Sequence, residues 1–437
     1  MDFLNRGTSL MTRQHRPRPS RAGLALALLL GLGAAAACGD VLDVDPPSRI
    51  PAGQLESPGN ANLLVTSAVG DFECAFGAYV VLGGLIGEEL GDATQTADRF
   101  PYDRRQIGPG DRRYSAFDCA DLGVYLPVNR ARASADNVAK RLETWTDAEV
   151  PGRTGLLAKS LVYAGYSLVL LGEGFCSATI SNIELDGTVT YGAEMTPTQI
   201  LTAAEERFTR ALATAGISAS DRNLALLGRA RARLDQGRYA EARADAVQIP
   251  AGFVVNVTGS GTSARRQNRV WAQNSTTGNA TTVGERYRGL NDPRVPVFDK
   301  ARTSATGVAL WGQSKYPDAS TPIPLATYEE AQLIVAEADA RAGGAALANA
   351  ITILNAIRAR GNQPAMDPAS TQPQVLAEVV EQRRRELFLE SHHLGDAIRF
   401  GITLTPASGT AYPGGGTYGT SKCMPLPDVE RINNPNI

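Results

Sequence analysis

The sequence predicts an all-α fold in which tetratricopeptide-like helix pairs stack into a right-handed superhelical scaffold, interrupted by one long irregular insertion. Three observations lead to this prediction. Apolar residues recur at helical spacing through much of the 437-residue chain. The segment Gly-Arg-Tyr-Ala-Glu-Ala at residues 237–242 has the turn spacing of a tetratricopeptide repeat. Residues 252–325 lose the helical spacing and are rich in Gly, Ser, Thr, Asn and Pro.

The first 37 residues have the pattern of a secretory signal. Four arginines within residues 13–21 directly precede an apolar run over residues 22–37, which is rich in Leu and Ala and ends in small residues. The run is too short for a comfortable membrane span. The whole chain has a net charge of -2 and the signal itself is basic, so the rest of the chain is acidic. It therefore has no electrostatic reason to bind nucleic acid.

Helices are expected in most of the segments that follow. In chain order, apolar spacing predicts two helical segments over 61–91, a helix over 128–145, a strongly apolar and central helix over 155–172, and helices over 198–215 and 223–246. Residues 99–126 are rich in Gly, Asp and Arg, which indicates an irregular surface. The helix-pair unit recurs loosely over residues 329–360.

The last predicted helix covers residues 378–401 and is amphipathic. Val379, Leu387 and Leu394 belong to its apolar face. Its other face is crowded with charge, and Glu381 stands four residues before Arg385, in the order that favours an ion pair along a helix. Such a pattern is typical of a helix that docks on a helical bundle.

The charges of this segment are similar to the C-terminal signature of the RagB/SusD family, outer-membrane lipoproteins that pair with TonB-dependent transporters for nutrient uptake. The residues that carry the resemblance are Arg384, Glu386, Glu390, Asp396 and Arg399, together with Asn355 and Arg358 of an earlier Asn-x-x-Arg-x-Arg-Gly pattern. The resemblance implies that these residues are structural and clamp the helix against its neighbours. It also implies a SusD-like arrangement of the predicted helical repeats.

The resemblance extends to the N-terminus. Ala35-Ala36-Ala37-Cys38-Gly39 resembles a bacterial lipobox, in which the cysteine is acylated with fatty chains such as palmitate, although Ala35 stands where leucine is preferred. Plain signal cleavage is the alternative. We therefore expect a chain anchored by Cys38 to lipid of the outer membrane and facing the cell surface.

The expected organisation follows from the signal and the resemblance. A tether over residues 38–55 leads into one SusD-like domain over residues 56–437. That domain divides into an N-terminal half with helical repeats over 56–251, a loop-rich ligand region over 252–325, and the C-terminal signature helices and terminal loop over 326–437.

Four cysteines remain after Cys38, and an exported chain with an even number of cysteines can hold two disulfides in any of three pairings. The pairing that we favour joins Cys74 to Cys119, which links two N-terminal helices. It also joins Cys176 to Cys423, which holds the C-terminal loop on the helical core. The alternative is four buried free thiols.

Little in the sequence suggests catalysis. No His-Glu-x-x-His or Gly-x-Ser-x-Gly motif occurs, and the only histidines beyond the signal are the adjacent His392 and His393. We therefore expect no enzyme activity, no metal site and no cofactor. Glu88, Glu89 and Asp92 could supply the paired acids of a surface glycosidase, which remains an alternative.

A binding function is expected instead. Aromatic rings can stack on the apolar face of a sugar, and the irregular segment is rich in them. The candidate ligand-binding residues are Trp271, Tyr287, Trp311 and Tyr316, with Asp92 and Arg99 from an earlier loop. The resemblance implies capture of a glycan or another oligomeric nutrient, and delivery to a SusC-like TonB-dependent transporter that the protein covers as a lid. The rival is a scaffold lipoprotein of envelope assembly that binds no small ligand.

Overall fold

Helices are the main secondary structure of the chain, whose computed structural model describes residues 55–437. The predicted signal peptide, the lipid anchor at Cys38 and the tether up to residue 54 lie outside the described residues. The predicted all-α, repeat-based fold is confirmed, and its elements are given below in the order in which they build the core.

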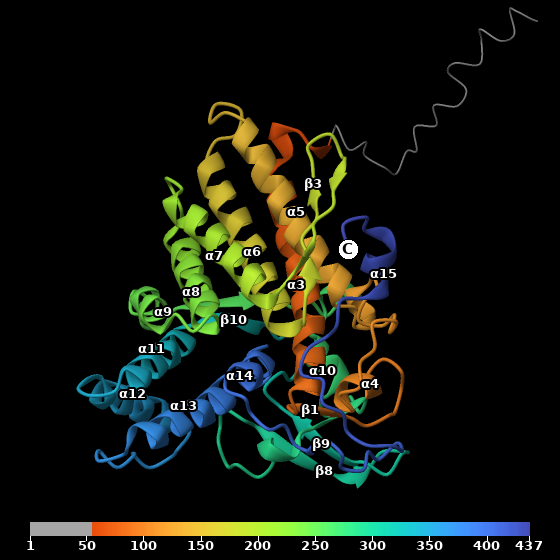
Figure 1. Cartoon of the computed structure of the whole chain (residues 1–437), viewed down its shortest axis with the longest axis vertical. Coiled ribbons are helices and arrows are strands. Elements are labelled where there is room, and N and C mark those ends of the chain that lie inside the picture. Colours follow the sequence, from red (N-terminus) through yellow and green to blue (C-terminus); the bar gives the residue numbers. More distant parts are fainter. Residues whose placement is uncertain (1–54) are drawn as a thin grey trace, which may run out of the picture. The chain divides into compact units, whose positions relative to one another are not determined.

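Three long helices form the centre: α3 (Ala61–Ile86), α5 (Tyr125–Thr144) and α6 (Arg153–Gly174), which pack against one another (Figure 1). The stretches Pro58–Ile86 and Arg153–Gly174 are long and apolar enough to cross a membrane, but 83% and 72% of their most apolar windows are buried inside the fold. They are therefore core helices. The prediction of two segments over 61–91 was wrong, because burial on all sides outweighs the low helix propensity of the glycines within α3.

A row of helices continues from α6. In order these are α7 (Pro197–Ala213), α8 (Ala219–Asp235), α9 (Tyr239–Ala246), α11 (Tyr328–Ala342), α12 (Ala346–Arg360) and α13 (Gln372–Glu386), each in contact with the one before it. Between α8 and α9, Gly237 has a φ of 73°, which glycine adopts without strain. The Arg341 guanidinium lies 4.3 Å from the centre of the Tyr239 ring and connects α11 to α9.

The insertion between α9 and α11 is organised by short antiparallel strand pairs. β6 (Val254–Val257) pairs with β10 (Ile323–Thr327), β7 (Thr281–Val283) pairs with β1 (Leu90–Asp92), and β8 (Val297–Thr303) pairs with β9 (Ala309–Gln313). The short helix α10 (Arg269–Gln273) packs on α3. Figure 1 shows β1, β8, β9 and α10 gathered around the C-terminal end of α3. Loops from distant parts of the sequence therefore meet at this end.

The remaining elements are short. They are η1 (Pro58–Asn60), α4 (Phe100–Asp103), η2 (Cys119–Asp121), η3 (Ala264–Arg266), η4 (Glu285–Tyr287), α14 (His393–Arg399), α15 (Asp428–Asn433), and the pairs β2 (Ala178–Thr179) with β5 (Glu194–Met195) and β3 (Asn182–Ile183) with β4 (Val189–Thr190).

The single helix predicted over residues 378–401 is wrong, because α13 ends at Glu386 and α14 begins at His393. In the turn between them, Leu389 and Ser391 have φ values of 56° and 74°, which a right-handed helix does not allow. Side chains from other elements form hydrogen bonds with the backbone groups of this turn. The Glu89 carboxylate accepts from Leu389 N at 2.7 Å, and the Tyr316 hydroxyl donates to Leu389 O at 3.0 Å.

The signature charges around this turn form buried ion pairs with neighbouring elements. Glu386 accepts from Arg294 of the insertion at 3.0 Å and from Arg360 of α12 at 2.9 Å. Glu390 pairs with Lys315 of the insertion at 2.6 Å. Because the partners come from separate segments, the pairs set how the last two helices sit on the rest of the fold.

Asp396 is the second centre of this network. It accepts from Arg383 and from Arg399 at 2.8 Å, and Arg399 continues to Glu337 of α11 and lies 3.3 Å from Asp235 of α8. Burial alone would raise the pKa of Asp396, but the Arg383 and Arg399 guanidiniums outweigh it and hold the pKa below its ordinary value. Asp396 is therefore ionised at neutral pH.

The other signature residues also make structural contacts. Arg384 donates to Glu381 at 2.8 Å and to the carbonyl of Arg286 at 2.5 Å. Arg358 pairs with Glu378 of α13, and the Asn355 side chain accepts from Met366 N at 2.8 Å. The expected pair of Glu381 with Arg385 is present at 2.5 Å.

Both favoured disulfides are confirmed. Cys74–Cys119 joins α3 to η2 across a Cα–Cα distance of 5.8 Å, and Cys176–Cys423 joins the segment after α6 to the C-terminal loop across 5.2 Å. Beside the second bridge, Cys176 N donates to Met424 O and Met424 N donates to Gly174 O, both at 2.9 Å. The C-terminal loop is thus held covalently and by backbone hydrogen bonds.

Replacing Cys176 and Cys423 together by serine should lower the free energy of unfolding by about 2–5 kcal/mol, the usual range for a native disulfide. Hydrogen exchange followed by mass spectrometry should show faster exchange in residues 402–427, because only noncovalent contacts then hold this segment. Unchanged unfolding and unchanged exchange would show that the bridge contributes no stability.

Asp396→Asn should lower the free energy of unfolding by about 3–5 kcal/mol at pH 7, because it leaves two buried guanidiniums without their shared partner. The pKa of Asp396 is lowered on folding, so its contribution is present above the unfolded pKa and is lost as the pH falls through the folded value. Denaturant titrations of the variant should therefore depend less on pH in the acid range.

The matched control is Glu381→Gln, which breaks the ion pairs with Arg384 and Arg385 at a carboxylate that is 32% exposed, against 6% for Asp396. Its effect on the free energy of unfolding should stay below about 1 kcal/mol. Equal losses for the two variants would contradict a special role for the Asp396 cluster.

Candidate functional site

A large exposed aromatic ring marks one place on the described surface as suited to ligands. Phe117 is 68% exposed, although it lies in a loop whose neighbours are mostly half-buried. Tyr191, which directly follows β4 (Val189–Thr190), is the other exposed aromatic among the large apolar side chains of the described residues, at 41%. Because most of the Phe117 ring is exposed to water, the ring contributes little to the core. An exposed aromatic ring of this kind is typical of a binding surface.

Phe117 borders a surface pocket of about 310 Å³. We call it the Phe117 pocket, and it is lined by Asp71, Phe117, Asp118, Cys119, Pro127, Arg130 and Arg265. The residues come from α3, η2, α5 and η3 with the loops beside them. The pocket therefore combines the irregular segment 99–126 with the start of the insertion.

The loop that carries Phe117 is held tightly. The disulfide to Cys74 fixes Cys119 on α3, and the Asp118 carboxylate caps η2 by accepting from Ala120 N at 2.8 Å. Gly123 closes the loop, where a Cβ atom would lie 2.3 Å from the carbonyl oxygen of Ala116. Only glycine fits such an approach. Phe117 is thus presented by a rigid loop, which reduces the entropy lost when a ligand binds.

Charged groups surround the ring. The Arg130 guanidinium lies 5.4 Å from the centre of the Phe117 ring, a cation–π arrangement. Asp71, which is almost fully buried, pairs with Arg265 and accepts from the Ser134 hydroxyl at 3.0 Å. The side chains of Arg130 and Arg265 each remain 50% exposed and keep donors available to a ligand.

Such a combination suits a sugar. A phenyl ring can contact the C–H face of a pyranose, while guanidinium donors and carboxylate acceptors bond its hydroxyls. The sequence prediction missed this site, because it placed the ligand-binding rings among the tryptophans and tyrosines of the insertion. The available signal was an aromatic residue beside Asp118 and Cys119 in a Gly- and Asp-rich segment, but its exposure depends on tertiary structure.

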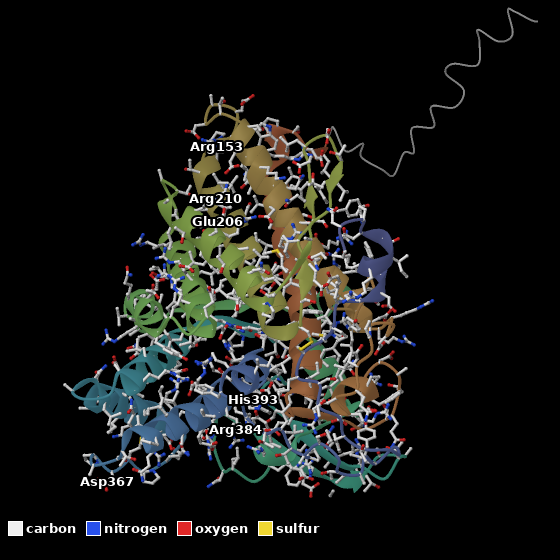
Figure 2. The ribbon with its side chains drawn as sticks, viewed as in Figure 1. Arg153, Glu206, Arg210, Asp367, Arg384 and His393 are labelled. Atoms are coloured by element: carbon white, nitrogen blue, oxygen red, sulfur yellow. A yellow bond between two sulfur atoms is a disulfide. The ribbon has the colours of Figure 1, made fainter. Side chains whose placement is uncertain are left out.

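Two of the predicted ligand-binding residues are wrong as stacking platforms. Tyr287 is fully buried: it stacks on Phe388 with ring centres 4.7 Å apart, and its ring also contacts Arg384 and His393, both labelled in Figure 2. Tyr316 is buried as well and bonds the turn after α13. Rings with no exposed face cannot stack on a ligand, so these two serve the core.

The two tryptophans are half-buried. Trp271 and Trp311 both pack against the main hydrophobic core, and the Arg288 guanidinium lies 5.4 Å from the Trp311 ring. Neither lines the Phe117 pocket. Their predicted role in ligand binding stays a prediction.

Asp92 and Arg99 lie together, with Arg99 Nε 3.5 Å from Asp92 Oδ1. Arg99 also donates to Gln273 of α10 at 3.1 Å. Asp92 lines a second cavity, at the C-terminal end of α3, and does not reach the Phe117 pocket. The predicted set of six residues therefore does not form one site.

Residues 55–437 contain no group of three or more His, Cys, Asp or Glu side chains that could hold a metal ion. His392 and His393 are buried. Burial, with Arg231 nearby, lowers the pKa of His392 well below its ordinary value, so this histidine is neutral. A buried neutral imidazole among arginines has no access to an external substrate.

The family comparison identifies a relationship over most of the C-terminal part of the chain. The model of the SusD family matches residues 187–433, which is more than half of the sequence. No curated protein matches the sequence.

Several solved structures have the same fold. A SusD-like carbohydrate binding protein from Bacteroides vulgatus superposes with a TM-score of 0.64 at 16% identity, over 87% of this chain and 97% of that one. A SusD superfamily protein from Parabacteroides distasonis superposes with a TM-score of 0.67 at 14% identity, over 86% of this chain and 98% of that one. For a laminarin binding SusD-like protein the TM-score is 0.65 at 15% identity, over 87% of this chain and 98% of that one. At these identities the superpositions establish the fold.

Proposed function

The chain belongs to the SusD family, and from this membership we propose that it is a noncatalytic nutrient-binding protein that captures a glycan at the Phe117 pocket. Two structural relatives support the class of ligand, since one is described as a carbohydrate binding protein and another as laminarin binding. The observation that carries the choice of site is the exposed Phe117 ring among charged hydrogen-bonding groups.

In this proposal each part of the pocket has its own task. The Phe117 ring contacts the apolar face of one sugar unit, and Arg130 and Arg265 donate to its hydroxyl or ring oxygens. Asp118 lies at the rim and can accept from a hydroxyl. The volume of the pocket, about 310 Å³, is comparable to one sugar unit, so the rest of an oligomeric nutrient would extend beyond it.

Phe117→Ala should weaken glycan binding by about tenfold or more, because it removes the stacking surface, and a tenfold change corresponds to about 1.4 kcal/mol. Isothermal titration of the folded chain against laminarin and a panel of other soluble polysaccharides measures the effect. Phe117→Trp should keep or improve affinity. The melting temperature should not change, since the ring is exposed.

Tyr191→Ala is the matched control, because it removes another exposed ring outside the pocket. It should leave the affinity unchanged. Equal binding by Phe117→Ala and the unaltered chain would refute this site, and no binding to any glycan in the panel would count against the ligand class.

We further propose that acylation of Cys38 anchors the protein to the outer membrane at the cell surface. There it would deliver the glycan to a TonB-dependent transporter and close over it as a lid. The lipobox-like sequence around Cys38 and family membership support this proposal. Lid opening would be a shift between two populations, set by the ligand and by the state of the transporter.

Affinity purification of the tagged full chain from native outer membranes in mild detergent should recover a large TonB-dependent barrel at near-equal amount, identified by mass spectrometry. A tagged, unrelated lipoprotein serves as the control for nonspecific recovery. Recovery of only periplasmic or assembly proteins would contradict the uptake proposal and favour the alternative of a scaffold lipoprotein.

A further inference from the structure

Most of the large apolar side chains that the described residues expose to water gather in two short segments. Of the twelve that are exposed, four belong to the β3–β4 hairpin and three to the C-terminal end; they are Ile183, Leu185, Val189 and Tyr191, and Val429, Ile432 and Ile437. The segments touch, because Asn436 Nδ2 donates to Tyr191 O at 2.6 Å and Asn434 Nδ2 donates to Gly192 O at 2.7 Å. A contiguous apolar surface of this kind marks a contact with a membrane or with a partner.

The hairpin directs its apolar side chains outward. Ile183 pairs with Val189 across the two strands, so both side chains lie on one face, and Tyr191 follows two residues later. The next side chain, Glu184, points to the other face and pairs with Lys140 of α5 at 3.1 Å. Antiparallel sheets with one solvated face usually direct the apolar face inward, so this arrangement is reversed. We call Ile183, Leu185, Val189 and Tyr191 the apolar hairpin surface.

The hairpin is attached to α5 close to the point where the described chain begins. Asn137 Nδ2 and Lys140 Nζ donate to Ile183 O at 3.3 Å and 3.4 Å. The residue after Lys140, Arg141, pairs with Glu56 at 2.6 Å. Figure 1 shows the hairpin beside α5, at the end of the fold where the coloured chain starts. The apolar hairpin surface and the first described residues are therefore held by one short stretch of the same helix.

The proposed lipid anchor is close to Glu56 in sequence. Residues 39–55 separate Cys38 from Glu56, and a chain of this length spans at most about 60 Å when it is fully extended. An acylated Cys38 would therefore keep the Glu56 end of the fold near the bilayer. The apolar hairpin surface lies at this same end, so it would be brought to the lipid together with Glu56.

A charge in the turn limits how deep the hairpin can enter a bilayer. The carboxylate of Asp186, beside Leu185, accepts from Thr188 N at 3.0 Å and from the Thr188 hydroxyl at 2.7 Å. Transfer of a carboxylate into hydrocarbon is costly, so the turn would stay among the lipid headgroups. Apolar side chains at this level reach the boundary of the acyl chains, and tyrosine is enriched at membrane interfaces. The surface therefore suits the interface of a bilayer.

We propose that the apolar hairpin surface contacts the bilayer leaflet that holds the acyl chains of Cys38. The inference rests on the proposed acylation and adds an orientation of the domain, which the proposed function leaves open. The hairpin would give the protein a second attachment to the same leaflet and would restrict rotation of the domain about its tether. Glycan capture stays possible, since the Phe117 pocket shares no residue with this surface.

Quenching of tryptophan fluorescence by brominated lipid tests the contact in the acylated full chain. Leu185→Trp is reconstituted through its anchor into phosphatidylcholine vesicles with brominated acyl chains, which quench a tryptophan that they approach closely. The emission added by Trp at position 185, relative to the three native tryptophans, should be lost. Val247→Trp places the same ring at an exposed apolar position after α9 and should keep its added emission.

Binding of the chain without its anchor measures the hairpin alone. Cys38→Ser removes the acylation site, and cosedimentation with phosphatidylcholine vesicles gives the partition coefficient of this variant. Adding Leu185→Asp should lower that coefficient by about tenfold or more, because a charge replaces an apolar contact. Adding Val247→Asp should leave it unchanged. Both positions are exposed, so the melting temperatures should stay the same.

Mass spectrometry of the mature N-terminus separates this inference from the proposed anchor. If Cys38 is acylated and Leu185→Trp keeps its added emission, the membrane contact is wrong and the anchor stands. If Cys38 carries no acyl chain, the anchor is wrong and the inference is overturned with it. Protection of residues 182–191 from hydrogen exchange by a partner protein or a second copy, without quenching by lipid, would assign the surface to a protein interface and also overturn the inference.

Discussion

The need to pair buried charge governs how the last part of the chain sits on the rest. Asp396 and Glu386 are each taken out of water between arginines that belong to different elements. An ion in such a place must be paired or the fold loses several kcal/mol. The elements that carry the paired arginines must therefore all lie next to the carboxylate. A small shift of any one of them would leave a buried charge unpaired.

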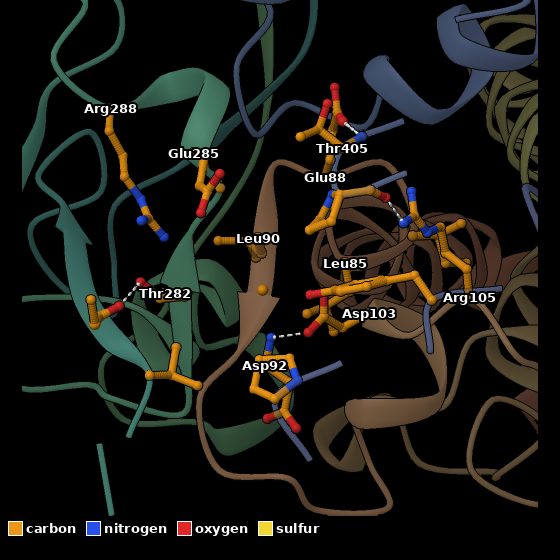
Figure 3. A pocket seen from close by; sticks show the side chains of 18 of the residues that line it. Leu85, Glu88, Leu90, Asp92, Asp103, Arg105, Thr282, Glu285, Arg288 and Thr405 are labelled. Carbon is orange, nitrogen blue, oxygen red and sulfur yellow. Dashed lines mark hydrogen bonds between the residues drawn. The ribbon is translucent and has the colours of Figure 1, made fainter. Parts of the chain in front are cut away.

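The same contacts also position the cavity that Asp92 lines at the C-terminal end of α3. The turn between α13 and α14 is bonded by Glu89 and Tyr316, which brings the end of α3 and the insertion against it. Glu88, the residue before Glu89, bonds Thr405 of the C-terminal loop, and both residues line that cavity (Figure 3). The cavity at the C-terminal end of α3 thus depends on hydrogen bonds between residues that do not themselves contact a ligand.

The sequence pattern correctly predicted the features that depend only on residues close together in the chain. The helices of the repeats, the Gly237 turn and the pair of Glu381 with Arg385 follow from spacing and from backbone preference. The break at Leu389 could not be predicted in this way, because partners for its backbone come from residues 89 and 316. Periodicity within one segment contains no information about such distant partners.

The candidate site likewise combines features that the sequence predicts with features that depend on the tertiary structure. Aromatic residues in an irregular segment predicted a binding surface, yet Tyr287 and Tyr316 fill the core and Phe117 is the most exposed aromatic ring among the described residues. Which ring is exposed depends on the disulfide at Cys119 and on the tight loop closed by Gly123. Composition suggested the kind of chemistry, whereas the choice of residue required the fold.

The bridge between Cys176 and Cys423 has a further consequence for a protein proposed to work outside the cell. It spans 247 positions of sequence, so the helices from α7 to α14 and the whole insertion lie inside one covalent ring. A single cut by an environmental protease in any exposed loop of that ring would open it without dividing the molecule. The two ends at the cut would stay attached through the sulfur atoms, and an anchor upstream of residue 176 would still retain everything up to the C-terminus.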